Sequence, residues 1–268
     1  MHVRLPSGMK LVDFLCGTWA GIVLVFVYLP ILLLVVYSFN SSRLNVRWTG
    51  FTLDWYRRLA GDRALLDAMK NSLIVAGATT VVATLLGTLG AWLLYRYSFP
   101  AMRTIGTLIF IPMVVPEVIM GISLRILYAA IGLNLGLTTI TIAHITFCFP
   151  FVMVAIQARL AGLDPALEEA AMDLGATPLR AFTKVIVPYL LPAIVAGALM
   201  CFTLSMDEYI VTVFTYGPNS QTFPIKVYGL AKVGLNPSLN AISTVLIVAT
   251  ALLTFCSEWL RKVNAAAP

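Results

Sequence analysis

Charged residues are scarce in this chain. Asp, Glu, Lys and Arg make up only 11% of its 268 residues, whereas 60% are hydrophobic and the mean hydropathy is +0.91. A soluble domain carries about 25% charged residues, so too little polar surface remains here to cover a water-soluble globule. The net charge of +6 comes from single basic residues in connecting segments, without a dense run. This scatter argues against a nucleic-acid partner and favours anchoring at membrane headgroups.

Sequence motifs for metal and nucleotide binding are also lacking. The four cysteines lie singly in apolar runs, without CxxC spacing or a histidine partner at metal-ligand distance, and we interpret them as small packing residues. No Gly-x-x-x-x-Gly-Lys-Ser/Thr loop is present to hold the phosphates of ATP. The sequence shows neither a nucleophile–base pair nor a cluster of metal ligands. We therefore expect this chain to bind no cofactor and to be no enzyme.

Long apolar runs dominate the sequence, and six of them approach the ~20 residues that cross a bilayer as a helix. The first run is too long for the core of a cleavable signal peptide, so we expect it to remain as a span. Pro112 and Pro116 in the third run predict a kink, because proline removes a backbone donor. We predict an all-α integral membrane protein, residues 1–268 forming one transmembrane domain, with spans at about 15–38, 72–95, 104–131, 138–158, 189–214 and 241–260.

Basic residues near the span ends bear on the orientation. With the N-terminus inside, nearly equal numbers of Lys and Arg fall on the two sides, so the total hardly decides. Many of the outer ones lie in the loop at about 40–71, where Trp48, Trp55 and Tyr56 suit a segment lying on the outer headgroups. Setting this loop aside leaves an excess of basic residues inside. We therefore predict that both termini are cytoplasmic.

The connection between spans four and five, residues 159–188, is moderately polar and rich in signals for helix ends. Asp164 suits a helix N-cap and is followed by acidic residues that the helix dipole favours. Gly175 suits a left-handed helix end, and Thr177 repeats the start signal for a second helix that runs to about Pro188. Two short helices joined by a glycine are typical of a docking element rather than a slack linker.

A spaced motif lies in the same connection. Glu169, Ala170 and Ala171 are followed after three residues by Gly175, and after nine more by Val-Ile-Val and Pro188. This resembles the EAA loop of bacterial ABC importer permeases, which ends in Ile-x-Leu-Pro, with two conservative valine replacements here. In that family the loop couples the permease to its ATPase. The alternative is an interfacial amphipathic helix without a partner. The resemblance assigns ATPase coupling to Glu168, Glu169, Ala170, Ala171, Gly175 and Pro188.

The resemblance extends over nearly the whole chain. Within the family, the chain most resembles the second of the two paired permeases of the spermidine/putrescine branch. The resemblance implies the type I importer permease fold and a location in the bacterial inner membrane. The implied partners are membrane lipid, a second permease, two ATPase subunits that carry ATP and Mg²⁺, and a periplasmic or extracellular substrate-binding protein. Branches for phosphonate, opine, thiamine and iron share much of the pattern and remain alternatives. Further matching residues are Asn71-Ser72-Leu73, Pro116-Glu117 and Ser205-Met206-Asp207-Glu208.

Carboxylates within the spans are the candidates for a substrate pathway. A charged side chain at the bilayer centre costs about 2.5–3.5 kcal/mol of insertion free energy, so Glu117, Asp207 and Glu208 are each expected to have a functional or structural role that offsets this cost. Three carboxylates with few internal bases suit a polyamine and would repel an anion. Tyr209 suits stacking on an ammonium group, although an interfacial aromatic belt explains it equally well. The alternative role for a carboxylate is a structural pair with Arg125.

Two further polar residues receive structural interpretations. Arg125 lies near the outer end of span three, where its side chain is expected to reach the outer headgroups. His144 lacks companion ligands for a metal and is expected to hydrogen-bond another helix. A channel or a secondary transporter would also contain helices and buried carboxylates. Neither class requires the loop at 159–188.

Overall fold

Helices make up nearly all the regular structure of the computed structural model, which describes residues 7–42, 47–97, 100–164, 166–232 and 237–248. The chain divides into two compact units, residues 1–62 with 229–268, and residues 63–228. The described residues agree with the predicted all-α class. The elements are α1 Ser7–Tyr37, α2 Asp54–Gly61, α3 Arg63–Arg96, α4 Pro100–Val114, α5 Glu117–Ala130, α6 Leu137–Leu160, α7 Ala166–Asp173, α8 Pro178–Ala181, the π-helix η1 Phe182–Ile186, α9 Val187–Asp207, α10 Ile210–Thr215, α11 Phe223–Lys232 and a helix at Pro237–Val248.

Among the described residues, four helical segments are long and apolar enough to cross a membrane: Phe14–Tyr37, Arg63–Arg96, Leu137–Leu160 and Pro178–Asp207. A fifth candidate is a bent pair formed by α4 and α5. Helices suit a bilayer because they satisfy every backbone polar group internally. The sixth predicted span begins within Pro237–Val248, and residues 249–260 lie outside the described part. The count of six spans therefore stays a prediction.

Within the first unit, a folded loop follows α1. The indole N–H of Trp55 donates to the carbonyl of Asn40 at 2.8 Å, and the hydroxyls of Ser38 and Tyr56 lie 2.6 Å apart. Asn40 is fully buried, and its side-chain oxygen accepts the backbone N–H of Thr49 at 3.0 Å. The sequence predicts a surface-lying segment here. The structure contains a hydrogen-bonded loop followed by the short helix α2.

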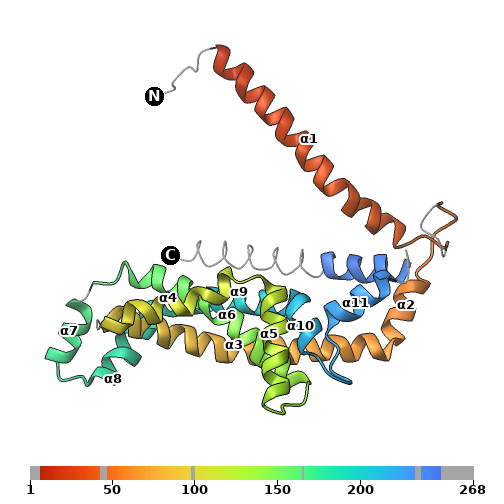
Figure 1. Cartoon of the computed structure of the whole chain (residues 1–268). Helices are drawn as coiled ribbons and strands as arrows, with labels where there is room; N and C mark the ends of the chain where they lie inside the picture. Colours follow the sequence, from red (N-terminus) through yellow and green to blue (C-terminus); the bar gives the residue numbers. More distant parts are fainter. Residues whose placement is uncertain (1–6, 43–46, 98–99, 165, 233–236, 249–268) are drawn as a thin grey trace. The chain divides into compact units, whose positions relative to one another are not determined.

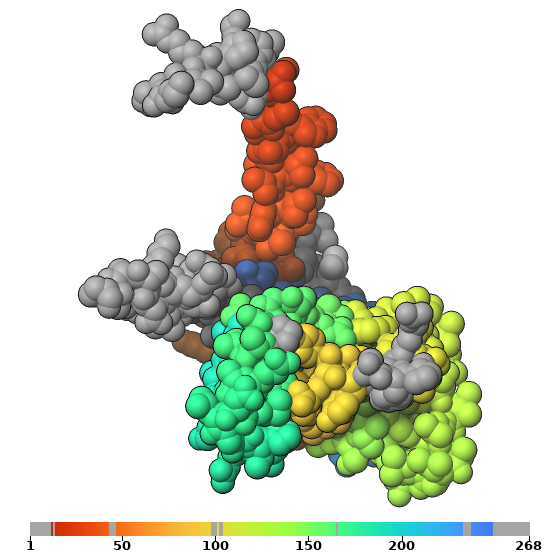
Figure 2. Space-filling model, turned by 90° about the vertical axis from the view of Figure 1, so that its left-hand side faces the viewer, coloured from red at the N-terminus to blue at the C-terminus, as the bar shows by residue number. Residues whose placement is uncertain are grey.

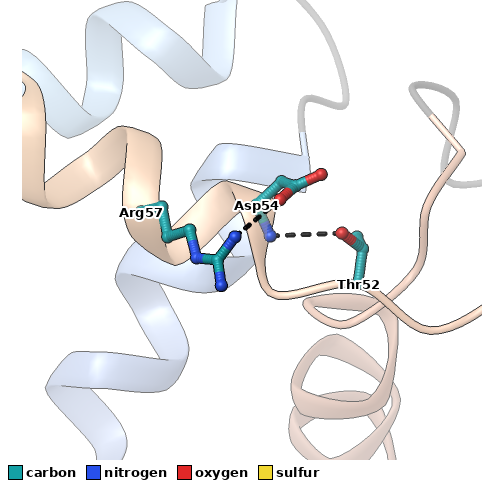
Figure 3. Close-up of polar contacts among 3 residues, drawn as sticks. All are labelled: Thr52, Asp54 and Arg57. Atoms are coloured by element: carbon teal, nitrogen blue, oxygen red, sulfur yellow. Dashed lines mark hydrogen bonds and ion pairs between the residues drawn. The ribbon is translucent and has the colours of Figure 1, made fainter.

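A hydrogen bond and an ion pair lie at the start of helix α2. The backbone N–H of Asp54 donates to the hydroxyl of Thr52 at 3.1 Å, and the Asp54 carboxylate lies 3.8 Å from the guanidinium of Arg57 (Figure 3). Both charged side chains are largely exposed. Such an exposed pair contributes about 0–1 kcal/mol, so it is a local feature of the helix start.

The core of the second unit is formed by α3, α6 and α9, which pack side by side (Figure 1). Val152 of α6 lies between two glycines. A Cβ added at Gly87 of α3 would approach the Val152 side chain to 2.9 Å, and one at Gly197 of α9 would approach it to 3.1 Å. Small residues permit this close approach, on which helix association in lipid depends.

The interpretation of the cysteines as packing residues is confirmed at two positions. Cys148 of α6 and Cys201 of α9 are buried and unbridged in the same core. Cys16 of α1 is exposed within this chain, and Cys256 lies outside the described residues.

Two predicted spans are interrupted. The sequence predicts a kink in the third, and the structure turns by 107° between α4 and α5, where Pro116 adopts an extended conformation ahead of α5. The sequence predicts no break in the fifth, yet α9 ends at Asp207 and α10 begins at Ile210. Glu208 is extended there, and its carboxylate accepts the backbone N–H of Val211 at 2.7 Å. This side-chain cap replaces a helical backbone bond.

Candidate functional site

The two short helices predicted between spans four and five are present as α7 and α8. The N–H of Ala166 donates to the carboxylate of Asp164 at 3.0 Å, just before α7. The hydroxyl of Thr177 caps α8 by accepting the N–H of Arg180 at 3.4 Å. Both caps satisfy N–H groups that a helix start leaves unpaired. The second helix does not stop near Pro188, because it continues through η1 into α9.

Gly175 ends α7 in a left-handed turn, as predicted, with φ of +87°. The N–H of Gly175 donates to the carbonyl of Met172 at 2.9 Å, and that of Ala176 to the carbonyl of Ala171 at 3.0 Å. These two bonds form a Schellman motif. A side chain at Gly175 would meet no atom within 4 Å, so the positive φ is what favours glycine.

The six residues assigned to ATPase coupling differ in exposure. Glu169, Ala170, Gly175 and Pro188 are exposed, and Ala171 is half-buried. Glu168 is only 6% exposed, because it faces the chain's own core. The structure therefore separates two neighbouring acids into an outward-facing and an inward-facing side chain.

Two leucines on either side of the turn at Gly175 were not identified from the sequence. Leu174 is 90% exposed and Leu179 is 71% exposed, so the turn between α7 and α8 presents an apolar tip. Figure 2 shows this end of the second unit, with α7 and α8 in green to teal beside the golden end of α3. Apolar residues next to a turn glycine in a polar loop are the signal that would have identified them.

The end of α3 contacts this loop at several points. The guanidinium of Arg96 forms an ion pair with the carboxylate of Glu168. The rings of Trp92 and Phe182 pack with centroids 4.4 Å apart. Sequence reasoning missed these contacts, since their partners lie on separate helices.

The three candidate pathway carboxylates gather near the two helix breaks. Glu117 is the first residue of α5, and Asp207 is the last residue of α9; both are exposed. Glu208 is 7% exposed and directly follows Asp207, and α10, which begins at Ile210, packs on α5, whose first residue is Glu117. The structure thus brings together residues from spans three and five.

Tyr209 follows these acids and is half-buried. Its ring packs against that of Tyr228 of α11, with centroids 4.5 Å apart. Tyr209 directly follows Asp207 and Glu208 in the chain, so the ring pair begins next to these two acids. Aromatic faces next to carboxylates are suited to an organic ammonium ion.

His144 and Arg125 hold the broken fifth span in place. The imidazole of His144 lies 2.7 Å from the hydroxyl of Ser205 in α9 and 2.8 Å from that of Thr212 in α10. The predicted helix-to-helix role of His144 is thereby confirmed. Arg125 donates to the carbonyl of Phe214 in α10 at 3.1 Å, so its guanidinium contacts protein, and its contact with the outer headgroups stays a prediction. Among the described residues, no group of three His, Cys, Asp or Glu side chains is placed to hold a metal ion.

Comparison with known proteins gives consistent matches. Residues 63–267 match the family described as "Binding-protein-dependent transport system inner membrane component". The chain is 40% identical over 246 residues to the spermidine/putrescine transport system permease protein PotC of Escherichia coli K12, covering 92% of this chain and 93% of PotC. It is also 40% identical over 242 residues to the putrescine transport system permease protein PotI of the same organism, covering 88% and 86%.

A similar fold occurs in a solved bacterial alginate ABC transporter, crystallised in complex with an alginate pentasaccharide-bound periplasmic protein. One of its chains gives a TM-score of 0.73 at 18% identity, covering 97% of this chain and 98% of that one. This likeness confirms the predicted importer permease fold. The family match confirms the prediction of a transport subunit rather than an enzyme. The chain belongs to the family of binding-protein-dependent transport system inner membrane components.

Proposed function

We propose that this permease forms the translocation pathway for a polyamine, spermidine or putrescine. The observation that carries the proposal is the cluster of Glu117, Asp207 and Glu208 at the breaks of two spans. The names of the relatives PotC and PotI support the same substrate class. A polyamine carries several ammonium groups, which a group of carboxylates attracts. The same carboxylates would repel an anionic substrate.

The chemistry of the cluster fits transient binding of a cation. Carboxylates at the two breaks offset part of the cost of removing water from an ammonium group. Asp207 and Glu117 are exposed within this chain and are free to contact a passing cation, whereas Glu208 is committed to capping α10. Tyr209 and Tyr228 add aromatic faces next to the acids. Interrupted helices near the membrane midplane are a common setting for substrate sites in transporters.

Coupling to ATP hydrolysis is assigned to residues 164–188. In the proposed complex, the exposed Glu169 pairs with a basic group of the ATPase, and small Ala170 permits close approach. Leu174 and Leu179 supply an apolar tip to the same contact. ATP and Mg²⁺ belong to the two ATPase subunits. This chain works beside a second permease, has both termini in the cytoplasm, and receives substrate from an external binding protein.

Uptake by an Asp207→Asn variant tests the substrate. The amide keeps the shape and removes the charge. A charge-assisted contact is worth about 1.5–3 kcal/mol, so uptake of labelled spermidine and putrescine should fall about ten- to a hundred-fold. Asp54→Asn makes the same chemical change at the largely exposed pair with Arg57 and should leave uptake unchanged.

The same vesicles are tested with an anionic and a neutral solute. Unchanged polyamine uptake in Asp207→Asn, or uptake of the anionic solute alone by the wild-type complex, would remove the proposed substrate class. The permease fold and family membership would stand in either case.

A further inference from the structure

One ion pair joins the coupling loop to a spanning helix. Arg96 is the last residue of α3, and Glu168 lies in the first turn of α7. Their guanidinium and carboxylate are in direct contact. The Glu168 side chain is 8% exposed and that of Arg96 is 25% exposed, so water screens the pair poorly. By contrast, the side chains of Asp54 and Arg57 in the other ion pair are 65% and 81% exposed.

Both helix ends favour this arrangement. The C-terminal end of a helix is electrically negative and favours the Arg96 guanidinium, while the N-terminal end is positive and favours the Glu168 carboxylate. The pair therefore connects the end of α3 to the start of α7, and each side chain carries the charge that its helix end favours. Removing either partner leaves a poorly solvated charge on the other, which strongly disfavours the contact.

A second contact lies beside the pair. Trp92 and Arg96 are four residues apart and so lie on the same face of α3. Trp92 packs on Phe182 of η1, while Arg96 holds Glu168 of α7. Helix α7 packs mainly on its neighbours α8 and η1, and η1 packs on α9. The end of α3 thus contacts both α7 and η1. These contacts add to the covalent connection between the loop and α9, which η1 provides.

We propose that Arg96 and Glu168 are positioning residues that fix α7 to α3 and carry movement of the coupling loop into the α3, α6 and α9 core. This inference rests on the proposed role of the loop in ATPase coupling. It gives Glu168 a task different from that of Glu169. Glu169 faces outward toward the ATPase, and Glu168 transmits the resulting movement inward. Without the pair, α7 should still move with the ATPase, but less of this movement should reach α3.

The test uses the assembled complex in vesicles and measures labelled spermidine uptake per ATP hydrolysed. Glu168→Gln and Arg96→Gln should each lower this ratio, by about three- to thirty-fold, the range seen when residues along a coupling route are altered. Exchanging the partners, Arg96→Glu with Glu168→Arg, should recover part of the loss, because the ion pair forms again although each charge then lies at the helix end that disfavours it. Asp54→Asn and Arg57→Gln remove the exposed pair in the same way and should not change the ratio.

Each outcome discriminates. A wild-type ratio in both single variants overturns the proposal, as does an exchanged pair no better than the single variants. Loss of the ATPase from the purified complex of either single variant also overturns it, since the pair would then serve docking. Glu169→Lys is measured alongside. If it keeps substrate-stimulated hydrolysis, the coupling role of the loop fails; if it abolishes hydrolysis while Glu168→Gln keeps the normal ratio, only the transmission role fails.

Discussion

Replacement of Gly175 by alanine isolates the effect of one backbone angle on coupling. The residue has φ of +87°, and an added Cβ would meet no atom within 4 Å. The cost is therefore backbone strain alone, about 1–2 kcal/mol for an L-residue in the left-handed region. The turn would open about five- to thirty-fold more often. Because the N–H groups of Gly175 and Ala176 close the turn, their hydrogen exchange should accelerate by the same factor.

Substrate-stimulated ATP hydrolysis in the reconstituted complex gives the functional consequence. If only the closed turn presents α7 correctly, the apparent affinity for the ATPase should fall by up to the same factor. Gly175→Asn should be milder, since asparagine adopts positive φ more readily. Gly175→Pro should abolish stimulation while the protein remains inserted, because proline also removes the N–H bonded to Met172.

Gly132 provides a matched control. It has φ of +69° in the turn between α5 and α6, and an added Cβ there also meets no atom within 4 Å. Gly132→Ala should therefore incur similar strain without affecting stimulated hydrolysis. Normal hydrogen exchange and normal stimulation in Gly175→Ala, or an equal loss of stimulation in Gly132→Ala, would show that the left-handed turn at Gly175 does not control coupling.

Two further predictions concern the membrane region and the orientation. His144→Leu removes hydrogen bonds to α9 and α10, each worth about 0.6–1.7 kcal/mol in a membrane protein, and should lower the midpoint temperature of thermal unfolding. The control Thr141→Val removes a hydroxyl bonded within α6 and should change this midpoint little. Equal midpoints in the two variants would contradict the bridging role of His144. A cysteine at Ser41 should react with an impermeant thiol reagent from outside, and one at Thr177 only after the membrane is opened; the reverse pattern would overturn the predicted orientation.

The coupling loop could be predicted in detail because its signals are local. Asp164 and Thr177 cap helices that begin within two residues of them, and Gly175 forms a turn with the residues just before it. Each is a contact between near neighbours in the chain. The residue types and their spacing therefore contain the necessary information.

The division of labour between Glu168 and Glu169 could not be predicted in this way. Adjacent residues on a helix point about 100° apart, and the helix dipole favours an acid at either position. Which one is buried depends on the side of α7 that meets Arg96, a tertiary contact with a distant helix.

The break in the fifth span escaped prediction for a similar reason. The run from 189 to 214 is apolar enough for one continuous helix. Its interruption depends on two features. The Glu208 carboxylate accepts a hydrogen bond from the first turn of α10, and the imidazole of His144 in α6 contacts one hydroxyl group in α9 and one in α10. Proline, the signal available in the third span, is absent at this break. The clustering of Glu117 with Asp207 and Glu208 likewise follows from tertiary packing.

The proposed role as a polyamine permease is best tested by ATP-dependent spermidine uptake into vesicles that contain the full complex, compared with vesicles lacking this chain. The complex comprises this permease, its partner permease, the ATPase subunits and the binding protein. Uptake should require both ATP and this chain, and loaded binding protein should stimulate ATP hydrolysis only when this chain is present. Spermidine uptake that proceeds without ATP, or stimulation that persists without this chain, would contradict the proposed role.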